Sequence, residues 1–326
     1  MLKFINKTKA GININYVIYQ IFLLVITSGF QSAIAQSFNS DFVRVANGYV
    51  VTPNITYIRA GGEELKLDVY QPGEKTGPNA TLIYFHGGGW TASDKESVAL
   101  DFLPFMEQGW TVVNVEYRLA SSAHAPAAVE DARCALRWIY RNAEEYGFDL
   151  DKIVASGTSA GGHLALTTGM LPASAGLDHQ CPGDRTRIWN GGTSSTQELK
   201  VAAIINWYGI TDVNDLQGRP AGPAGAYTDA WLGSDPDRLE TAARVSPINY
   251  VREGLPPVMT IHGDKDPSVH YSQAVRLHEA LDKAGVPNEL VTVKEGGHGE
   301  FSQTEMVRIY DHIGDFLREN NLGPTK

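Results

Sequence analysis

Short apolar runs recur along the chain beyond about residue 48, and their periods predict the elements of the fold. Residues 65–70 alternate strictly between apolar and polar side chains, and together with residues 49–58 they predict a half-exposed antiparallel hairpin. Continuous apolar runs are typical of strands that are buried on both faces of a sheet. Such runs occupy residues 81–85, 111–117, 153–156, 201–208, 258–262 and 290–293.

Helical spacing of apolar residues fills most of the intervals between these runs. The longest helix is predicted from Pro126 to Gly147, and others over 160–171, 269–284 and 304–320. Strands separated by helices pair in parallel through crossovers, so we expect a doubly wound α/β sheet with an antiparallel N-terminal edge. Two segments rich in Gly, Pro, Thr and Asp break this rhythm, and long irregular insertions usually act as lids or binding loops. These segments are residues 172–199 and 211–245.

The first 35 residues have the pattern of a cleaved signal peptide. Three lysines precede an apolar stretch over 16–30, and residues 33–35 read Ala-Ile-Ala, the small-x-small pattern that signal peptidase accepts. Polar and small residues interrupt the apolar stretch, which argues against a stable membrane span. We therefore expect a signal peptide over 1–35, one catalytic domain over 36–326, and a secreted or periplasmic protein.

Charge and cysteine content narrow the class of protein. The chain has 37 acidic and 27 basic residues and a formal charge of −10, which disfavours nucleic acid as a partner. Its two cysteines exclude a multi-cysteine zinc site. Cys134 and Cys181 either pair in an oxidising compartment or Cys134 stays a buried free thiol. No histidine has metal-ligand spacing, and neither a phosphate loop nor a dinucleotide fingerprint is present, so no metal or cofactor is expected.

The strongest chemical motif is Gly-Thr-Ser-Ala-Gly over residues 157–161. It directly follows an apolar strand and directly precedes a helix. In a nucleophile elbow the serine occupies a strained turn between strand and helix, and the flanking glycines let the chain fold sharply. The motif predicts Ser159 as a nucleophile, whereas a glycine-rich turn without a chemical role is the alternative.

A second motif, His86 followed by three glycines and Trp90, ends another strand. Consecutive glycines let backbone N–H groups point at a ligand atom, as stabilisation of an oxyanion requires. We expect the hole to be formed by Gly88 and Gly89 with Ala160, the residue after the nucleophile. His86 itself is expected to support the loop rather than to carry protons.

A serine nucleophile needs a base and an acid that orients the base, and in this fold both follow the serine in the order acid, then histidine. Asp266 and His298 each lie in a loop just beyond the carboxyl end of a predicted strand, at the rim where doubly wound sheets place their sites. Asp264 is the alternative acid. Asp266 is favoured because its position allows it to turn back over the sheet edge, which leaves Asp264 as a turn residue.

Several aromatic residues are candidates for lining an acyl or sugar pocket, although such residues also simply pack a lid onto a domain. These candidates are Trp90, Trp189, Tyr208, Tyr227 and Trp231.

Taken together, the ordered motifs resemble the α/β-hydrolase esterases of the hormone-sensitive-lipase and acetyl-esterase group. The resemblance covers about residues 65–317. The matching segments are residues 86–90, 116–119 (EYRL), 126–138, 157–165, 262–266 and 297–298. It implies a carboxylic ester hydrolase without a cofactor, with Ser159, Asp266 and His298 as its catalytic triad.

The chain departs from many of these relatives in two loops, which bears on the substrate. Ser121 and Ser122 stand where a proline is common, and the loop after Asp266 continues Pro-Ser-Val. The sequence looks closer to secreted bacterial esterases that remove acetyl or feruloyl groups from plant polysaccharides. It is also similar to kynurenine formamidases, which expected export disfavours because their substrate is an intracellular metabolite.

We therefore expect hydrolysis of short-chain or aromatic acyl esters through an acyl-enzyme. A non-catalytic binding protein of this fold would usually lack a triad member, and a serine peptidase would bring a further domain.

Overall fold

The computed structural model describes residues 45, 47–74, 77–178, 181, 199–216, 223–234 and 236–323. Residues 49–326 form one compact unit. The expected signal peptide over 1–35 and the pocket candidate Trp189 lie outside the described residues, so both stay predictions.

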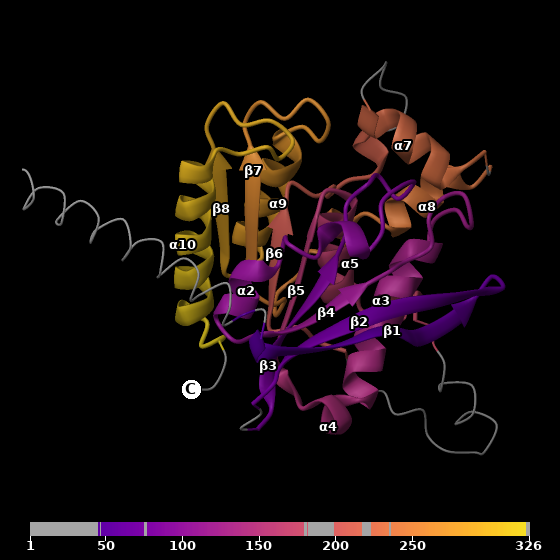
Figure 1. The fold of residues 1–326 in the computed structure, drawn as a ribbon. Helices are drawn as coiled ribbons and strands as arrows, with labels where there is room; N and C mark the ends of the chain where they lie inside the picture. The colour runs from indigo at the N-terminus through magenta and orange to yellow at the C-terminus, as the bar shows by residue number, and fades with distance from the viewer. Residues whose placement is uncertain are drawn as a thin grey trace, which may run out of the picture. The chain divides into compact units, whose positions relative to one another are not determined.

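An eight-stranded sheet forms the centre of the compact unit, in the order β1-β2-β4-β3-β5-β6-β7-β8 (Figure 1). Strands β1 and β2 form an antiparallel hairpin, β2 pairs antiparallel with β4, and every other pair is parallel. The strands are β1 (Tyr49–Ala60), β2 (Glu63–Pro72), β3 (Asn79–Phe85), β4 (Thr111–Val115), β5 (Phe148–Thr158), β6 (Ala203–Trp207), β7 (Val258–Gly263) and β8 (Asn288–Val293). This topology confirms the expected doubly wound sheet with an antiparallel N-terminal edge.

Helices cover both faces of the sheet, because the parallel strands carry apolar side chains on each face. In β3, for example, Ile83 and Phe85 enter one core cluster while Leu82 and Tyr84 enter the other. The first cluster includes side chains of α3, α5 and α9, and the second includes those of α2 and α10. The principal helices are α2 (Leu103–Glu107), α3 (Ala127–Arg141), α5 (Ala160–Met170), α9 (Ser272–Lys283) and α10 (Gln303–Glu319).

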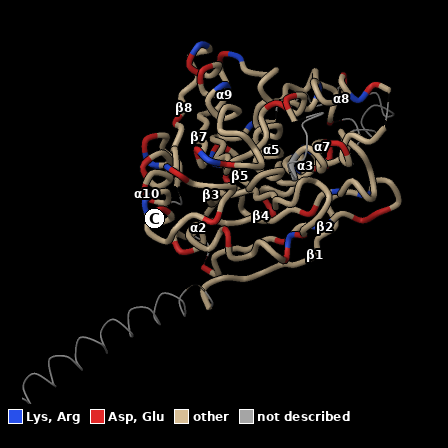
Figure 2. Tube along the Cα trace, turned by 90° about the horizontal axis from the view of Figure 1, so that it is seen from above, with Lys and Arg blue, Asp and Glu red and all other residues tan. Residues whose placement is uncertain are grey.

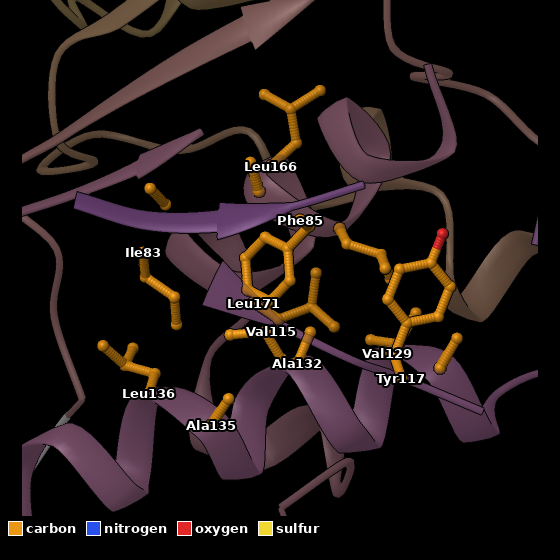
Figure 3. Packing of buried hydrophobic residues seen from close by; sticks show 14 of the residues in the cluster. Ile83, Phe85, Val115, Tyr117, Val129, Ala132, Ala135, Leu136, Leu166 and Leu171 are labelled. Carbon is orange, nitrogen blue, oxygen red and sulfur yellow. The ribbon is translucent and has the colours of Figure 1, made fainter. Parts of the chain in front are cut away.

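Close packing between α3 and the sheet shows how these layers are joined. Ala132 and Leu136 on α3 lie on the side of the helix that faces Phe85 and Val115 (Figure 3). The spacing of three to four residues along α3 places these small and large side chains on one stripe, which the strands bury. Truncating a buried side chain of this size to alanine, as in Phe85→Ala, costs about 3–5 kcal/mol in such cores.

Local chain geometry differs from the sequence expectation in two places. The predicted helix from Pro126 to Gly147 is divided at Asn142 into α3 and a short α4 (Ala143–Tyr146), and Gly147 ends it with a left-handed φ of 69°. The second insertion, expected to be irregular, contains α7 (Pro223–Leu232) and α8 (Arg238–Arg244). Short 3-10 helices η1 (Glu96–Val98), η2 (Ala173–Ala175), η3 (Asn214–Leu216) and η4 (Pro247–Tyr250) complete the described elements.

The beginning of the first insertion, residues 172–199, is bonded to α3. Cys134 and Cys181 form a disulfide, which settles the alternative that the sequence left open. Beside it, the buried guanidinium of Arg133 pairs with both carboxylate oxygens of Asp178, at 2.6 and 2.8 Å, and Arg137 adds a contact of 3.1 Å. These bonds hold residue 178 against the helix that packs on the sheet.

Acidic and basic residues are interspersed along the trace, in helices and strands as well as in loops (Figure 2). Among the helices within the described residues, none combines the length and apolarity that crossing a membrane requires.

Candidate active site

Ser159 lies in the turn between β5 and α5, at the carboxyl end of the sheet. Its backbone has φ 55° and ψ −117°, a conformation that a residue with a side chain rarely adopts. Two backbone bonds maintain it: its N–H donates to the carbonyl of Trp207 at 2.8 Å, and its carbonyl accepts from the N–H of His163 at 3.0 Å. Strained backbone that its surroundings maintain is concentrated at functional sites.

The two glycines on either side of this serine are required because the end of β3 approaches the turn too closely for a side chain. A Cβ on Gly157 would lie 2.4 Å from the carbonyl oxygen of Phe85, and one on Gly161 would lie 2.0 Å from the same oxygen. Both distances are far below contact distance. The turn can therefore pack against the end of β3, from which the glycine loop begins.

His298 and Asp266 join Ser159 in one chain of hydrogen bonds. The imidazole Nε2 of His298 lies 2.9 Å from the Oγ of Ser159, and its Nδ1 lies 2.7 Å from the Oδ2 of Asp266. Asp266 follows β7 and His298 follows β8, so neighbouring parallel strands bring the two side chains to one edge. The structure thus brings together the three side chains that the sequence singled out.

The surroundings of Asp266 favour its ionised form. Burial by itself would raise the pKa of this carboxyl, but hydrogen bonds from His262 and His298, the charge of His298 and the N–H of Val269 hold it well below its ordinary value. Its Oδ1 accepts from the N–H groups of Ser268 and Val269, at 2.7 and 2.9 Å. An ionised and fixed carboxylate is what a histidine base needs as its partner.

Asp264, the alternative acid, has a different role. Its Oδ1 accepts a hydrogen bond from the backbone N–H of Glu295 at 2.7 Å, which ties together the loops after β7 and β8. Asp264 is thus a turn residue, as the sequence analysis expected if Asp266 is the acid that orients the histidine.

The glycine loop after β3 lies directly against the serine. A Cβ on Gly87 would lie 3.6 Å from the Cβ of Ser159. Within the part of the chain that the structure describes, no group accepts a hydrogen bond from the backbone N–H of Gly88, Gly89 or Ala160. These are the three donors that the sequence predicted for an oxyanion.

Tyr117 holds the glycine loop in place through hydrogen bonds and ring stacking. Its hydroxyl donates to the carbonyls of His86 and Gly87, at 2.9 and 3.2 Å, and its ring stacks on the buried imidazole of His86 at 4.2 Å. His86 is therefore placed as a support of the loop, as predicted.

A cavity of about 310 Å³ opens beside Ser159 and His298. Three of the predicted aromatic residues line it, namely Trp90, Tyr208 and Tyr227. The ring of Tyr208 contacts the imidazole of His298 edge-on at 4.8 Å. Further lining residues are Gly87, Gly88, Gly89, Ala92, Thr158, Ile210, Leu216, Thr228, Ser268 and Val269.

Trp231 does not reach this cavity. Its ring is fully buried and stacks on Trp90 at 4.0 Å, and both rings meet the imidazole of His163 edge-on. Burial lowers the pKa of His163 to about 4, so this imidazole is neutral and belongs to an aromatic core behind the cavity. Trp231 thus anchors α7 rather than contacting a ligand.

His262 is a neighbour of the site that the sequence analysis did not single out. Its side chain is fully buried, and its Nε2 lies 3.2 Å from the Oδ2 of Asp266. The signal that could have found it is its position at the end of β7, four residues before the acid. Within the described ranges, no group of three or more His, Cys, Asp or Glu side chains is arranged to hold a metal ion.

This fold, with its serine elbow and glycine loop, is that of the α/β-hydrolases. More narrowly, the chain belongs to the BD-FAE family, whose family model matches residues 67–281. The family resemblance and the fold that the sequence predicted are both confirmed.

Known relatives agree with this class. Esterase LipQ of Mycobacterium tuberculosis is 30% identical over 79% of this chain. A propionate-bound thermophilic esterase, Est2 of Thermogutta terrifontis, is 27% identical and superposes with a TM-score of 0.67 over 86% of this chain and 97% of its own. A bifunctional GH43-CE protein of Bacteroides eggerthii is 26% identical, with a TM-score of 0.67 over 81% of this chain.

The chain spans 60% of the length of LipQ and 38% of the bifunctional protein.

Proposed function

We propose that this protein is a serine carboxylic ester hydrolase that works through an acyl-enzyme. The observation that carries the proposal is the continuous hydrogen-bonded chain from Asp266 through His298 to Ser159, with distances of 2.7 and 2.9 Å, at the edge of an open cavity. A nucleophile, a base and an orienting acid within hydrogen-bonding reach are the geometric requirements for this chemistry.

In the first half of the reaction, the Oγ of Ser159 attacks the ester carbonyl while the Nε2 of His298 takes its proton. The resulting tetrahedral oxyanion accepts hydrogen bonds from three backbone N–H groups. These donors belong to Gly88, Gly89 and Ala160. When the intermediate collapses, the carbon–oxygen bond to the alcohol breaks and His298 gives its proton to the departing alcohol.

In the second half, His298 takes a proton from water as the water oxygen attacks the acyl-serine. Collapse of that intermediate releases the carboxylic acid and returns the proton to Ser159. Asp266 stays ionised throughout and holds the imidazole in the tautomer whose Nε2 accepts the proton.

We also propose short-chain or aromatic acyl esters as substrates, including those attached to plant polysaccharides. Three aromatic residues line the cavity of about 310 Å³. The propionate-bound relative and the bifunctional GH43-CE neighbour are consistent with small acyl groups and carbohydrate esters. A secreted or periplasmic location fits this proposal, because disulfides such as Cys134–Cys181 persist in oxidising compartments.

The direct test compares Ser159→Ala with Ser156→Ala, using p-nitrophenyl acetate and a fluorophosphonate label. Ser156 is a buried serine of β5, three residues before Ser159, whose Oγ donates to the carbonyl of Ile205, so it is a matched control. Ser159→Ala should lower kcat by about 10⁴-fold or more and abolish labelling, whereas Ser156→Ala should keep both. Labelling or wild-type turnover by Ser159→Ala would overturn the assignment.

A rate panel tests the substrate class separately. It compares p-nitrophenyl acetate, butyrate and octanoate with methyl ferulate and acetylated xylan. We expect the highest kcat/KM among the acetyl and feruloyl esters. A preference for octanoate would contradict the proposed class while leaving the serine mechanism intact.

A further inference from the structure

His262 contacts Asp266, and this contact has no role in the mechanism described above. Its imidazole lies at the carboxyl end of β7, with no exposed surface on the side chain. The Nε2 atom is 2.8 Å from the carbonyl oxygen of Val269 and 3.2 Å from the Oδ2 of Asp266. We propose that His262 is a positioning residue, which fixes the Asp266 carboxylate for His298; this role rests on the proposed ester hydrolysis.

The two acceptors determine where the proton of His262 lies. A carbonyl oxygen and a carboxylate oxygen both accept hydrogen bonds, so Nε2 must carry the hydrogen and share it between them. The other ring nitrogen, Nδ1, is buried and has no partner among the described residues. A buried polar atom without a partner is costly, and its retention calls for an explanation beyond filling space.

The bonds around Asp266 form a closed arrangement that prevents its carboxylate from turning. Oδ1 is held by the N–H groups of Ser268 and Val269, and Oδ2 is shared by the imidazoles of His298 and His262. Val269 closes the ring, because its N–H donates to Asp266 and its carbonyl accepts from His262.

Without His262, one side of Oδ2 and the carbonyl of Val269 would both lose their donor. The carboxylate could then rotate away from the Nδ1 of His298, and the imidazole would be held less firmly in the tautomer that accepts the proton of Ser159. The effect should fall on kcat, since His262 does not line the cavity that would receive the substrate.

Three variants of the full chain separate this role from a merely structural one. His262→Leu removes the donor, whereas His262→Gln restores an N–H near the position of Nε2. His278→Leu is the matched control: His278 is also buried, with Nδ1 bonded to Asn288 at 2.6 Å and Nε2 without a partner in the described chain, but it lies near the amino end of β8, away from the site.

The measurements are kcat and KM per active site, counted by fluorophosphonate labelling, and the downfield proton NMR signal of the hydrogen on Nδ1 of His298. For His262→Leu we expect kcat to fall about 10-fold or more, KM to stay within about twofold, and the signal to shift or broaden. His262→Gln should recover most of kcat and the signal. His278→Leu should change only thermal stability.

Two outcomes overturn the inference. One is a His262→Leu variant with wild-type kcat and an unchanged signal, and the other is a His262→Gln variant as impaired as His262→Leu. Failure of the proposed function would look different, because the wild-type protein itself would neither hydrolyse esters nor react with the label.

Discussion

Removing the Cys134–Cys181 disulfide should destabilise the folded protein while leaving the site intact. The bond joins two buried sulfur atoms that are 47 residues apart in sequence, and it connects α3 to the first insertion. Neither cysteine lines the cavity beside Ser159. A cross-link over this separation constrains the unfolded chain far more than it changes the folded one.

The sequence separation sets the size of the effect. The chain-entropy relation gives about 4 kcal/mol for a loop of this length, and measured values for single disulfides are mostly about 2–4 kcal/mol. At roughly 2 cal/mol/K of unfolding entropy per residue, a loss of this size lowers the Tm of a domain of about 280 residues by about 3–7 °C. The ion pairs between Asp178 and the two arginines of α3 remain in the variant and keep the fold the same.

The assay is thermal unfolding of the wild-type protein and of Cys134→Ala/Cys181→Ala, each with and without dithiothreitol. The double variant should melt below the oxidised wild type by the stated amount and should not respond to the reductant. Its kcat on p-nitrophenyl acetate should match that of the wild type. A double variant and a reduced wild type that both melt within about 1 °C of the oxidised protein would refute the reasoning.

Three further perturbations test the site. In the folded protein the pKa of the buried Asp266 is depressed, so its charge stabilises the fold above about pH 4 and the stabilisation is lost as the pH falls through the lower folded-state value. In urea unfolding at a series of pH values, the free energy of unfolding of Asp266→Asn should therefore fall less on acidification than that of the wild type; an equal fall in both proteins would contradict this. Gly161→Ala should lower stability by about 2 kcal/mol or more in thermal unfolding, because its Cβ would meet the Phe85 carbonyl at 2.0 Å; a wild-type Tm would exclude this. A Cβ placed on Gly89 would lie 2.6 Å from the ring of Tyr227, so this ring lies directly against the glycine loop. Tyr227→Ala should therefore enlarge the cavity and raise kcat/KM for octanoate relative to acetate about 10-fold; an unchanged ratio would show that Tyr227 does not limit the cavity.

The parts of the fold that the sequence predicted are those with strong local signals. The strict alternation over residues 65–70 marks a strand with one exposed face, and the continuous apolar run over 153–156 marks a strand covered on both faces. Both became strands, and Leu65, Leu67 and Val69 enter the core as expected. The other face of residues 65–70, expected to be exposed, is instead largely covered, because Asp68 is buried and Tyr70 packs against the second core cluster. The serine elbow was equally predictable, because Gly157 and Gly161 are needed wherever the turn packs against the end of β3.

The second insertion shows where local signals are insufficient. Its composition indicated loops, but residues 223–232 and 238–244 form helices that tertiary packing stabilises. Within α7, Tyr227 and Trp231 are four residues apart and so share one side of the helix. Tyr227 covers the glycine loop at the cavity, whereas Trp231 lies deeper on Trp90. Periodicity alone cannot distinguish these two depths, because it carries no information about the distance to the neighbouring element.

The choice between Asp264 and Asp266 depends on contacts across the sheet edge, as does the role of His262. Both aspartates lie in the loop after β7 and both accept backbone N–H groups, so local turn chemistry does not separate them. What separates them is the loop after β8, which presents a backbone N–H to Asp264 and the imidazole of His298 to Asp266. The same carboxylate also lies 3.2 Å from the Nε2 of His262, which donates to the carbonyl of Val269 at 2.8 Å. The position of His262 four residues before the acid places it near the site, but its bond to the backbone carbonyl of Val269, seven positions away, follows only from the folded geometry.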